Sequence, residues 1–308
     1  KSGTNAFHGA AWEFHRNDNL NARSFFQSQK PQLIQNQYAA AAGGPIRRDR
    51  AFIFGTVEIT DDRRQAAATT ALPPTRAELA GDFSHLRGTR QLVNPFDNRP
   101  FPDNQIPAAL FDTAARKVLE FVPAVTSGSV QALGATPRDS SLFMLRGDGH
   151  LTSKQTLIGH YYFQQNRIRN EGLAYGSNIA GWTSQAQGPR IQNAGISHNY
   201  ALSPTLLNQL TLGYTRSFSL STPTITRLPS ELGMAGMPPY TDGGSPRFNV
   251  VGRFNLGSGG PVKFISNTYQ VQEHVNWIRN RHTLKFGLEH LDVSFFQSFL
   301  GPPQFSFN

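Results

Sequence analysis

Long segments in which apolar and polar residues alternate are the feature that most constrains how this chain can fold. In "TYQVQEHVNWIRNRHTLKFGLEH" (residues 268–290), apolar side chains take every second position on both sides of the polar turn at Asn280, with Glu273 as the exception. A period of two puts alternate side chains on opposite faces of a β-strand. The segment therefore predicts two strands joined by a tight turn.

The same alternation predicts about nine strands in the whole chain. The expected strands cover residues 6–16, 37–43, 51–61, 141–151, 155–166, 191–202, 206–217, 267–279 and 282–295. Most are longer than the common five or six residues, and lengths near ten are those of a tilted strand that crosses a membrane. A soluble β-sandwich gives the same alternation, so the faces alone do not decide between these classes.

The connections between the expected strands separate the two classes better. Short turns are predicted at residues 44–50, 152–154, 203–205 and 279–281, and long polar connections rich in Pro and Gly at 17–36, 62–140, 168–190 and 220–266. Short and long connections alternate strictly. In an up-and-down sheet this puts every turn at one end and every loop at the other, as in outer-membrane barrels. We expect an all-β, antiparallel up-and-down transmembrane β-barrel, present here as a partial barrel.

Composition agrees with this expectation. Charged residues make up 16% of the chain, against roughly 25% in an average soluble domain, and 28 Gly and 23 Phe accompany 20 Pro. The absence of cysteine excludes disulfides, thiolate metal sites and a cysteine nucleophile. The net charge of +9 suggests nucleic acid, anionic lipid or the phosphates of lipopolysaccharide as a partner. The densest basic group, at Arg47, Arg48 and Arg50, is interrupted by Asp49 and is read as a solvated turn.

The longest connection, residues 62–140, contains a helical pattern. In "PAALFDTAARKVLEFVP" (residues 107–123), Leu110, Ala114 and Val118 recur at helical spacing between two prolines. We expect a short surface helix inside a long extracellular loop; a ligand-binding lid is the alternative.

Several motifs resemble the start of the barrel in Oar-like TonB-dependent receptors. They are "KSGTNAFHGAAWEFHRNDNLNARSFF" (1–26), "NQYAAAAGGPIRRDRAFIFGTVE" (36–58), "LPPTRAELAGDFS" (72–84), "PFPDNQIPAALF" (100–111), "LSPTLLNQLTLGYTR" (202–216) and "NWIRNRHTLKFG" (276–287). The likeness covers almost the whole chain and keeps the family's order. Within it, the glycines of "GGPI" permit a sharp bend, and Pro45 removes a donor that a strand ladder would need. Pro204 in "SPT" likewise removes a hydrogen-bond donor at a turn.

The resemblance implies a plugged outer-membrane barrel of about 22 strands, of which these residues form roughly the first nine. Such receptors import a bound substrate with energy delivered through TonB, which acts on the plug. Neither the plug nor the closing half of the barrel is recognisable here, and both ends of the chain look cut, so import is expected only of the complete protein. The implied partners are the TonB complex, outer-membrane lipid with lipopolysaccharide, and an unknown substrate, with no nucleic acid.

No pattern for enzyme chemistry is present: GxxxxGK[ST], HExxH and GxSxG are all absent. We therefore expect no catalytic, cofactor-binding or metal-binding residues and leave the substrate-binding residues unknown. "GSGG" at residues 257–260 lacks the strand-to-helix setting of a phosphate loop and is read as a flexible loop. Asp61 and Asp62 could hold a cation, but Arg63 and Arg64 beside them favour a compensated strand end.

The histidines raise the question of a metal site. His150 and His160, with Asp148 near, lie on neighbouring expected strands, and zinc or copper needs three or four converging ligands. Hydrogen-bonding roles inside a lumen are the favoured reading. Glu289 and His290 point to opposite faces of one strand and cannot bind one metal together.

Two features stay open at this stage. Glu273 shares a face with apolar residues, so either that face looks into the lumen or Glu273 lies near a membrane interface, where an acid costs only ~0–1 kcal/mol. Trp12, Phe52 and Trp277 lie near strand ends and form either interfacial girdles or ordinary packing. The leading hypothesis is an outer-membrane receptor or transporter with substrate recognition in the long loops. The competing one is a surface-exposed β-sheet binding module, such as an adhesin, that recognises carbohydrate or protein.

Overall fold

A long antiparallel sheet forms the body of the molecule. The structure is a computed structural model that describes residues 3–25, 30–65, 68–237, 243–257, 259–299 and 301–307. The nine long strands of the sheet are β1 (His8–Asn17), β2 (Leu33–Arg47), β3 (Ala51–Arg64), β6 (Arg138–Thr152), β7 (Gln155–Asn170), β9 (Arg190–Ser203), β10 (Leu206–Pro223), β13 (Val262–Arg279) and β14 (His282–Phe299). The short β8 (Gln185–Gln187) is inserted between the loop ends of β7 and β10. The all-β antiparallel prediction is confirmed.

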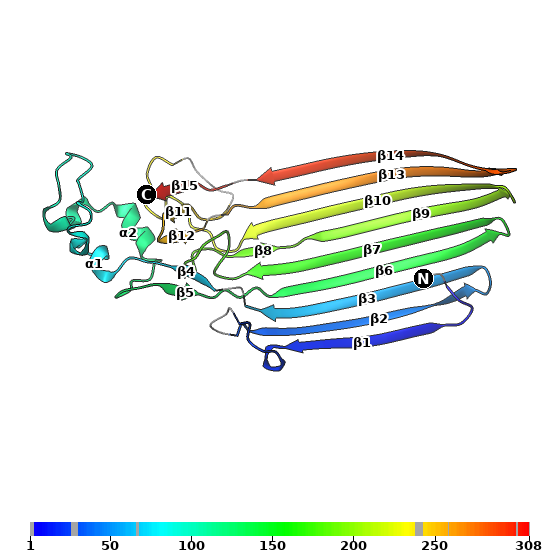
Figure 1. Ribbon diagram of the computed structural model, residues 1–308, viewed down its shortest axis with the longest axis horizontal. Coiled ribbons are helices and arrows are strands. Elements are labelled where there is room, and N and C mark those ends of the chain that lie inside the picture. Colours follow the sequence, from blue (N-terminus) through cyan, green and yellow to red (C-terminus); the bar gives the residue numbers. More distant parts are fainter. Residues whose placement is uncertain are drawn as a thin grey trace.

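Each long strand pairs with the one before it in sequence, so the sheet is an up-and-down meander that starts at β1 and ends at β14. All four tight turns lie at one end of the sheet and all long connections at the other (Figure 1). Among the described residues β1 and β14 do not pair with each other, so the sheet is open and has two free edges.

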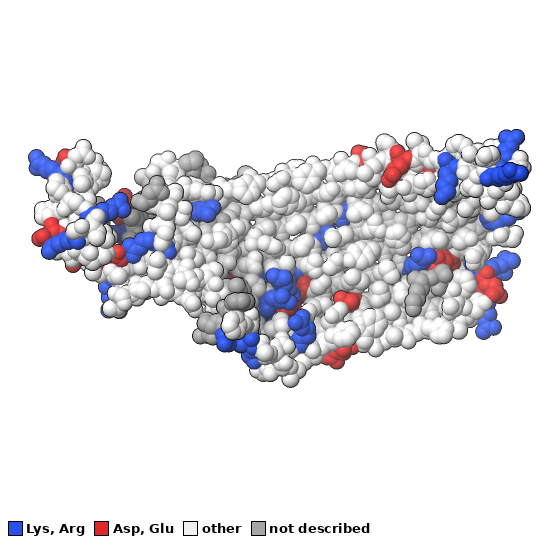
Figure 2. All heavy atoms as spheres, in the orientation of Figure 1, with Lys and Arg blue, Asp and Glu red and all other residues white. Residues whose placement is uncertain are grey.

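The two faces of the sheet differ in chemistry. Residues directly opposite one another in the pairing share a face, and following the register across the sheet separates an apolar face from a polar one. Apolar residues of the first face include Ile53, Val57, Phe143, Leu145, Tyr161, Ile196, Leu212, Tyr269, Val271, Phe286 and Leu288, all of them exposed. The second face carries Thr, Ser, Asn, Gln and His on most strands. In Figure 2 the sheet is mostly uncharged, with Lys, Arg, Asp and Glu in small separate groups. An exposed apolar face of this extent needs lipid to cover it.

The segment before β1 folds back on the β2–β3 turn. The Asn5 amide donates to the Asp49 carboxylate, and the Asp49 backbone N–H donates to Asn5 Oδ1 at 2.8 Å. The Phe7 ring lies over Gly44, where a Cβ would come within 2.2 Å of it. The ladder shifts register between Pro45 and Arg47, so the proline occupies an irregular position that tolerates its missing donor. The two glycines of "GGPI" are therefore needed for close packing around this turn.

The long connections fold into a compact body beyond one end of the sheet, here called the loop cap (Figure 1). It contains the short strands β4 (Thr69–Ala71), β5 (Val130–Ala132), β11 (Arg247–Val250), β12 (Phe254–Leu256) and β15 (Gln304–Phe307), the helices α1 (Arg76–Leu79) and α2 (Thr113–Leu119), and the 3-10 turns η2 (Ser84–Leu86), η3 (Pro102–Asn104) and η4 (Ala108–Leu110). A further 3-10 turn, η1 (Asp18–Leu20), follows β1. No described helix is long and apolar enough to cross a membrane.

The loop cap has its own hydrophobic core. Trp182 is 0% exposed and packs edge-on against Phe121 and Phe248, with ring centroids 5.3 and 5.8 Å away. Its indole N–H donates to the Pro246 carbonyl at 3.1 Å, so the only polar atom of this side chain is satisfied. These contacts join three connections far apart in sequence: the one after β3, the one after β7 and the one after β10.

Replacing Trp182 with alanine should loosen the loop cap without unfolding the sheet. Removing a large buried aromatic side chain costs about 3–5 kcal/mol, and the loss falls on contacts that only the cap makes. Limited proteolysis of the folded protein should then cut within residues 168–190 and 223–261 much faster than in the parent. The control is Phe96→Ala, because Phe96 is 84% exposed in the same cap. Equal protection in the Trp182 variant would show that the cap does not depend on this core.

Candidate functional site

The loop cap is built around a buried carboxylate. Thr75 begins α1 as a capping box: the Glu78 backbone N–H donates to Thr75 Oγ1 at 3.2 Å, and the Thr75 N–H donates to Glu78 Oε2 at 2.7 Å. The Glu78 side chain is only 5% exposed. A carboxylate at this depth needs a charged partner.

Arg253, which lies between β11 and β12, supplies that charge. Its two terminal nitrogens donate to the two oxygens of Glu78 at 2.8 Å each, in the bidentate geometry that suits a guanidinium. The same side chain donates to the backbone carbonyls of Leu72 and Pro73, both at 3.3 Å, and the Leu72 N–H donates back to the Arg253 carbonyl at 2.7 Å. One ion pair thus fastens the connection after β10 to the connection after β3.

The ion pair controls the titration of Glu78. Its pKa is lowered to about 2, mainly by the hydrogen bonds from Arg253 and also by those with Thr75, against the opposing effect of burial. Glu78 therefore stays ionised at neutral pH.

A second link uses the amide of Asn178. Its nitrogen donates to the Thr70 carbonyl at 3.0 Å, and its oxygen accepts from the Asn255 N–H at 2.7 Å. The Asn178 backbone N–H donates to the Asn255 carbonyl at 3.0 Å. Asn178 therefore connects all three of the connections that build the cap core.

A third link is cationic. The Arg227 guanidinium lies 4.2 Å from the centre of the Phe121 ring and 5.1 Å from that of Trp182, and it donates to the Gly181 carbonyl at 3.0 Å. Burial lowers the pKa of Arg227, with the Glu231 charge acting in the opposite direction. The three links make the cap a single preorganised surface.

The cap contains an apolar cavity of about 310 Å³ beside α2. Its walls are almost all carbon, from Val118, Leu119, Met234, Phe248, Phe254 and Phe305. This volume lies at the lower end of the range for small-molecule pockets. Such a cavity can hold an apolar group but offers few polar atoms to orient it, so it fits one part of a larger ligand better than a whole polar one.

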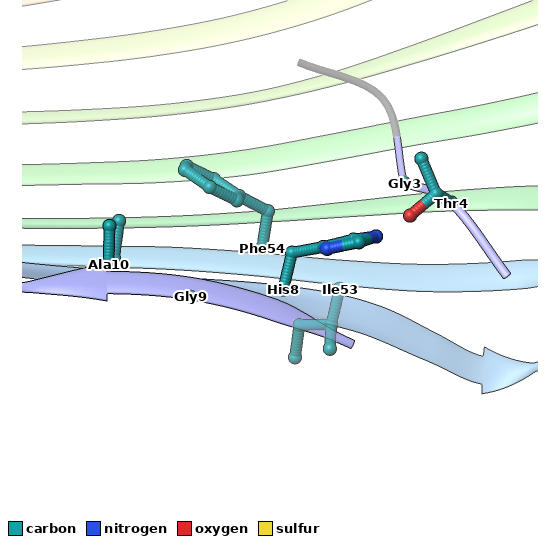
Figure 3. Close-up of a pocket in the computed structure, with 9 residues that line it drawn as sticks. Gly3, Thr4, His8, Gly9, Ala10, Ile53 and Phe54 are labelled. Carbon is teal, nitrogen blue, oxygen red and sulfur yellow. The ribbon is translucent and has the colours of Figure 1, made fainter. Parts of the chain in front are cut away.

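A second hollow lies at the turn end of the sheet. It has a volume of about 520 Å³ and is lined by Gly3, Thr4, His8, Ile53 and Phe54 among others. His8 and Phe54 project to the side of the sheet on which the Gly3–Thr4 stretch lies, whereas Ile53 points away (Figure 3). The hollow is open and formed by the folded-back segment, so it is read as a packing gap and not as a binding site.

The polar face of the sheet holds the histidines considered above. His160 Nε2 lies 2.7 Å from Asn193 Oδ1, and His150 Nδ1 lies 3.3 Å from Thr156 Oγ1. Asp148 is bound by Arg146 at 2.7 Å. The three residues face the same side of the sheet but each is engaged elsewhere, and no group of three or more potential ligands forms among the described residues.

The acidic residues examined in the sequence also pair locally. Asp61 binds Arg63 at 2.6 Å on the apolar face, and Asp62 binds Arg64 on the polar face, so the two acids do not form one site. Glu273 lies on the apolar face and accepts a hydrogen bond from Asn208 at 2.7 Å. The two readings left open for Glu273 were the lumen and an interface, and its position excludes the lumen.

Two further sequence features can now be located. Trp277 projects from the apolar face near the turn end, with Arg279 5.3 Å from its ring, whereas Trp12 and Phe52 lie on the polar face. Only Trp277 is therefore positioned for an interfacial girdle. In "GSGG", Ser258 lies outside the described residues, and Gly259 packs so closely on the Tyr175 ring that a Cβ would fall 2.1 Å from it. These glycines serve close packing and leave no cradle for a phosphate.

Sequence reasoning missed the residues that build the cap. The capping box was visible as "TRAE" (residues 75–78), which has the Thr-x-x-Glu spacing of a helix start. The partner Arg253 and the core residue Trp182 carry no local signal, because each acts through contacts more than fifty residues away in sequence.

Acidification should open the cap through Glu78. Its pKa is lowered by folding, so its contribution to stability is present above the unfolded value near 4.3 and is lost as the pH falls toward about 2. The expected loss is on the order of 2–3 kcal/mol. Glu78→Gln should remove this pH dependence and leave the cap sensitive to protease at pH 7, whereas Glu120→Gln, at an exposed acid of the same connection, should leave it protected. A parent cap that is equally resistant at pH 2.5 and pH 7 would contradict this account.

Comparison with known proteins agrees with the architecture. The family model described as "Outer membrane beta barrel domain" matches residues 1–308. No curated protein and no solved structure matches the chain. An apolar outward face, long tilted strands and turns sorted from loops are the features that this family uses to cross the outer membrane. The chain belongs to the outer membrane beta barrel domain family and is a protein of the outer membrane.

Proposed function

We propose that this chain forms part of the barrel of an Oar-like TonB-dependent receptor, which binds a substrate at the cell surface and imports it across the outer membrane. The observation that carries the proposal is the loop cap, whose three connections are fastened by Trp182, Asn178 and the Arg253–Glu78 ion pair. Preorganised loops above a polar lumen face are suited to selecting a ligand. The motifs that resemble Oar-like receptors support the same function.

The proposed role is not enzymatic. On the polar face, His160, His150 and Asp148 each contact a neighbouring side chain, and no described group combines a nucleophile with an oriented base. Substrate is recognised by the cap, with its apolar cavity beside α2 holding an apolar portion. The energy for import comes from the TonB complex acting on a plug domain of the complete protein.

One observation favours a second function, adhesion. Residues 82–111 project from the rest of the cap and expose Phe96, Val93 and Leu110 to 84%, 48% and 43% (Figure 1). Exposed aromatic and aliphatic side chains on a protruding loop suit contact with another protein or a carbohydrate. Adhesion needs no energy from the inner membrane, which distinguishes the two functions.

The orientation that both functions require can be tested by cysteine labelling of the full-length protein in intact cells. A membrane-impermeant maleimide should label Ser127→Cys in the loop cap. It should not label Arg281→Cys in the β13–β14 turn until the outer membrane is permeabilised, because short turns of such barrels face the periplasm. Leu212→Cys on the apolar face should stay unlabelled in both conditions. Equal labelling at positions 127 and 281 in intact cells would contradict a membrane-spanning barrel.

Import can be distinguished from adhesion by contact with TonB. In isolated membranes, the full-length protein should form a crosslink with the purified periplasmic domain of TonB, and the yield should rise when substrate-containing medium is added. A variant whose extreme N-terminal region ahead of the barrel is deleted should lose the crosslink while still inserting in the membrane. A full-length protein that never contacts TonB, but whose cells still adhere to a surface coated with protein or carbohydrate, would support adhesion instead.

A further inference from the structure

Three arginines stand at one border of the apolar face. The outward-facing positions of β7, β9 and β10 can be followed from the short turn toward the loop end. The first of them to hold Lys, Arg, Asp or Glu is Arg167 on β7, Arg190 on β9 and Arg216 on β10. Between the turns and these residues the outward positions are apolar or uncharged, and they include the aromatic Tyr161, Phe163 and Tyr214.

The height of the three arginines matches a membrane boundary. With a rise of about 3.3 Å per residue and a tilt of about 40°, they lie roughly 25–33 Å above the short turns. The apolar band of an outer-membrane barrel is about 25 Å tall. Since the loop end faces the outside, the arginines lie where the headgroups of the outer leaflet begin.

The pairing register places the three side chains together. Arg190 is directly opposite Gln165 on β7 and Phe218 on β10, which are two residues from Arg167 and Arg216. Diagonal neighbours of this kind on adjacent strands have their side chains about 7–8 Å apart. Arg167, Arg190 and Arg216 therefore form one diagonal row, here called the arginine row.

The arginine row has hydrogen-bonding capacity that the protein does not use. Among the described residues, the Arg167 guanidinium has no hydrogen-bond or ion-pair partner. The Arg190 guanidinium lies 5.3 Å from the Phe218 ring and makes no hydrogen bond or ion pair among the described residues. Arg216 makes one long hydrogen bond, 3.3 Å, to Asn267. Unpaired guanidinium donors beside a lipid surface indicate an external acceptor.

The other charges near the row lie around Arg167, where Asp61 and Asp139 share Arg63, so the uncompensated charge of the row lies mainly on Arg190 and Arg216. Asp139 is opposite Arg167 but is bound by Arg63 at 2.7 Å, and Arg63 also binds Asp61. Arg63 is thus satisfied within the protein and is not counted in the site. Arg169 lies 4.0 Å from Glu171, so that pair adds no net charge.

We propose that the arginine row binds the phosphate groups of a phosphorylated glycolipid in the outer leaflet. Guanidinium groups match phosphate oxygens in a bidentate geometry that lysine does not reproduce. The side chains point toward lipid and not into the lumen, so the acceptor is a membrane lipid and not a substrate on the import path. Phe163, Tyr214 and Phe218 beside the row contact its sugar and the upper part of its acyl chains. This inference rests on the outer-membrane location alone and is independent of import.

The test uses the purified full-length protein in detergent, with native mass spectrometry to count bound lipid. The probes are bisphosphorylated lipid A and the same lipid A after removal of its phosphates. The parent should bind the bisphosphorylated form, and the variant with Arg167, Arg190 and Arg216 all changed to Gln should bind it at least about tenfold more weakly, because each charged hydrogen bond to phosphate contributes strongly. The corresponding triple Arg→Lys variant should bind with intermediate affinity.

The matched control removes three charges at the opposite end of the sheet, through Arg48→Gln, Lys154→Gln and Arg281→Gln. It should bind lipid A as the parent does. All variants should keep the heat-modifiable migration on gels that is typical of a folded barrel. Equal binding by the parent and the arginine-row variant, or equal binding of phosphorylated and dephosphorylated lipid, would overturn the proposal. Complete displacement of the lipid by millimolar inorganic phosphate would assign the row to a free anion instead and would also overturn it.

Discussion

The backbone hydrogen-bond ladder is the constraint on which the rest of this structure depends. Hydrocarbon offers no partner for an amide N–H or C=O, so every such group in a spanning segment must be paired within the protein. The nine long strands pair with their sequence neighbours over 10 to 18 residues, with register shifts confined to the turn ends. Such ladders leave the two faces free to diverge in chemistry, one toward lipid and one toward a wet interior.

The loop cap is stabilised differently from the sheet, because it lies in water and depends on side-chain contacts between its connections. These contacts are a compact core around Trp182 and buried polar links between the connections. The Glu78 carboxylate, for example, meets two donors from Arg253 and one from Thr75. Breaking one partner of such a network costs more than the network contributes, since the other is left buried and unpaired. The cap is therefore expected to be either folded as a unit or open.

The sequence was sufficient to predict the sheet because its determinants are local. Alternation at positions such as Leu210, Leu212 and Tyr214 directly predicts a strand. Gly, Pro and Asn at the short turns predict where the strands end. Two of the turns contain a residue in the left-handed region, Asp49 and Asn280, which are residue types that tolerate positive φ. The cap was not predictable, since its contacts join residues such as Glu78 and Arg253 that are 175 positions apart. The only local signals for the cap in the sequence are the capping box at residues 75–78 and the helical pattern at residues 107–123.

The last long strand combines the two environments. On β14 the apolar side chains lie on the lipid-facing side at Phe286 and Leu288, but the side changes farther along, where Val293 and Phe295 occupy the opposite face and Asp292 takes the outward position. The β13–β14 register is continuous across this change, so no bulge re-aims the side chains. The outward side becomes apolar again at Phe296, so Asp292 and Ser294 form a short polar band on this side of the strand. This band lies on the loop half of the strand, as the arginine row does on β7, β9 and β10, so two independent patterns place outward-facing polar groups in the same part of the sheet.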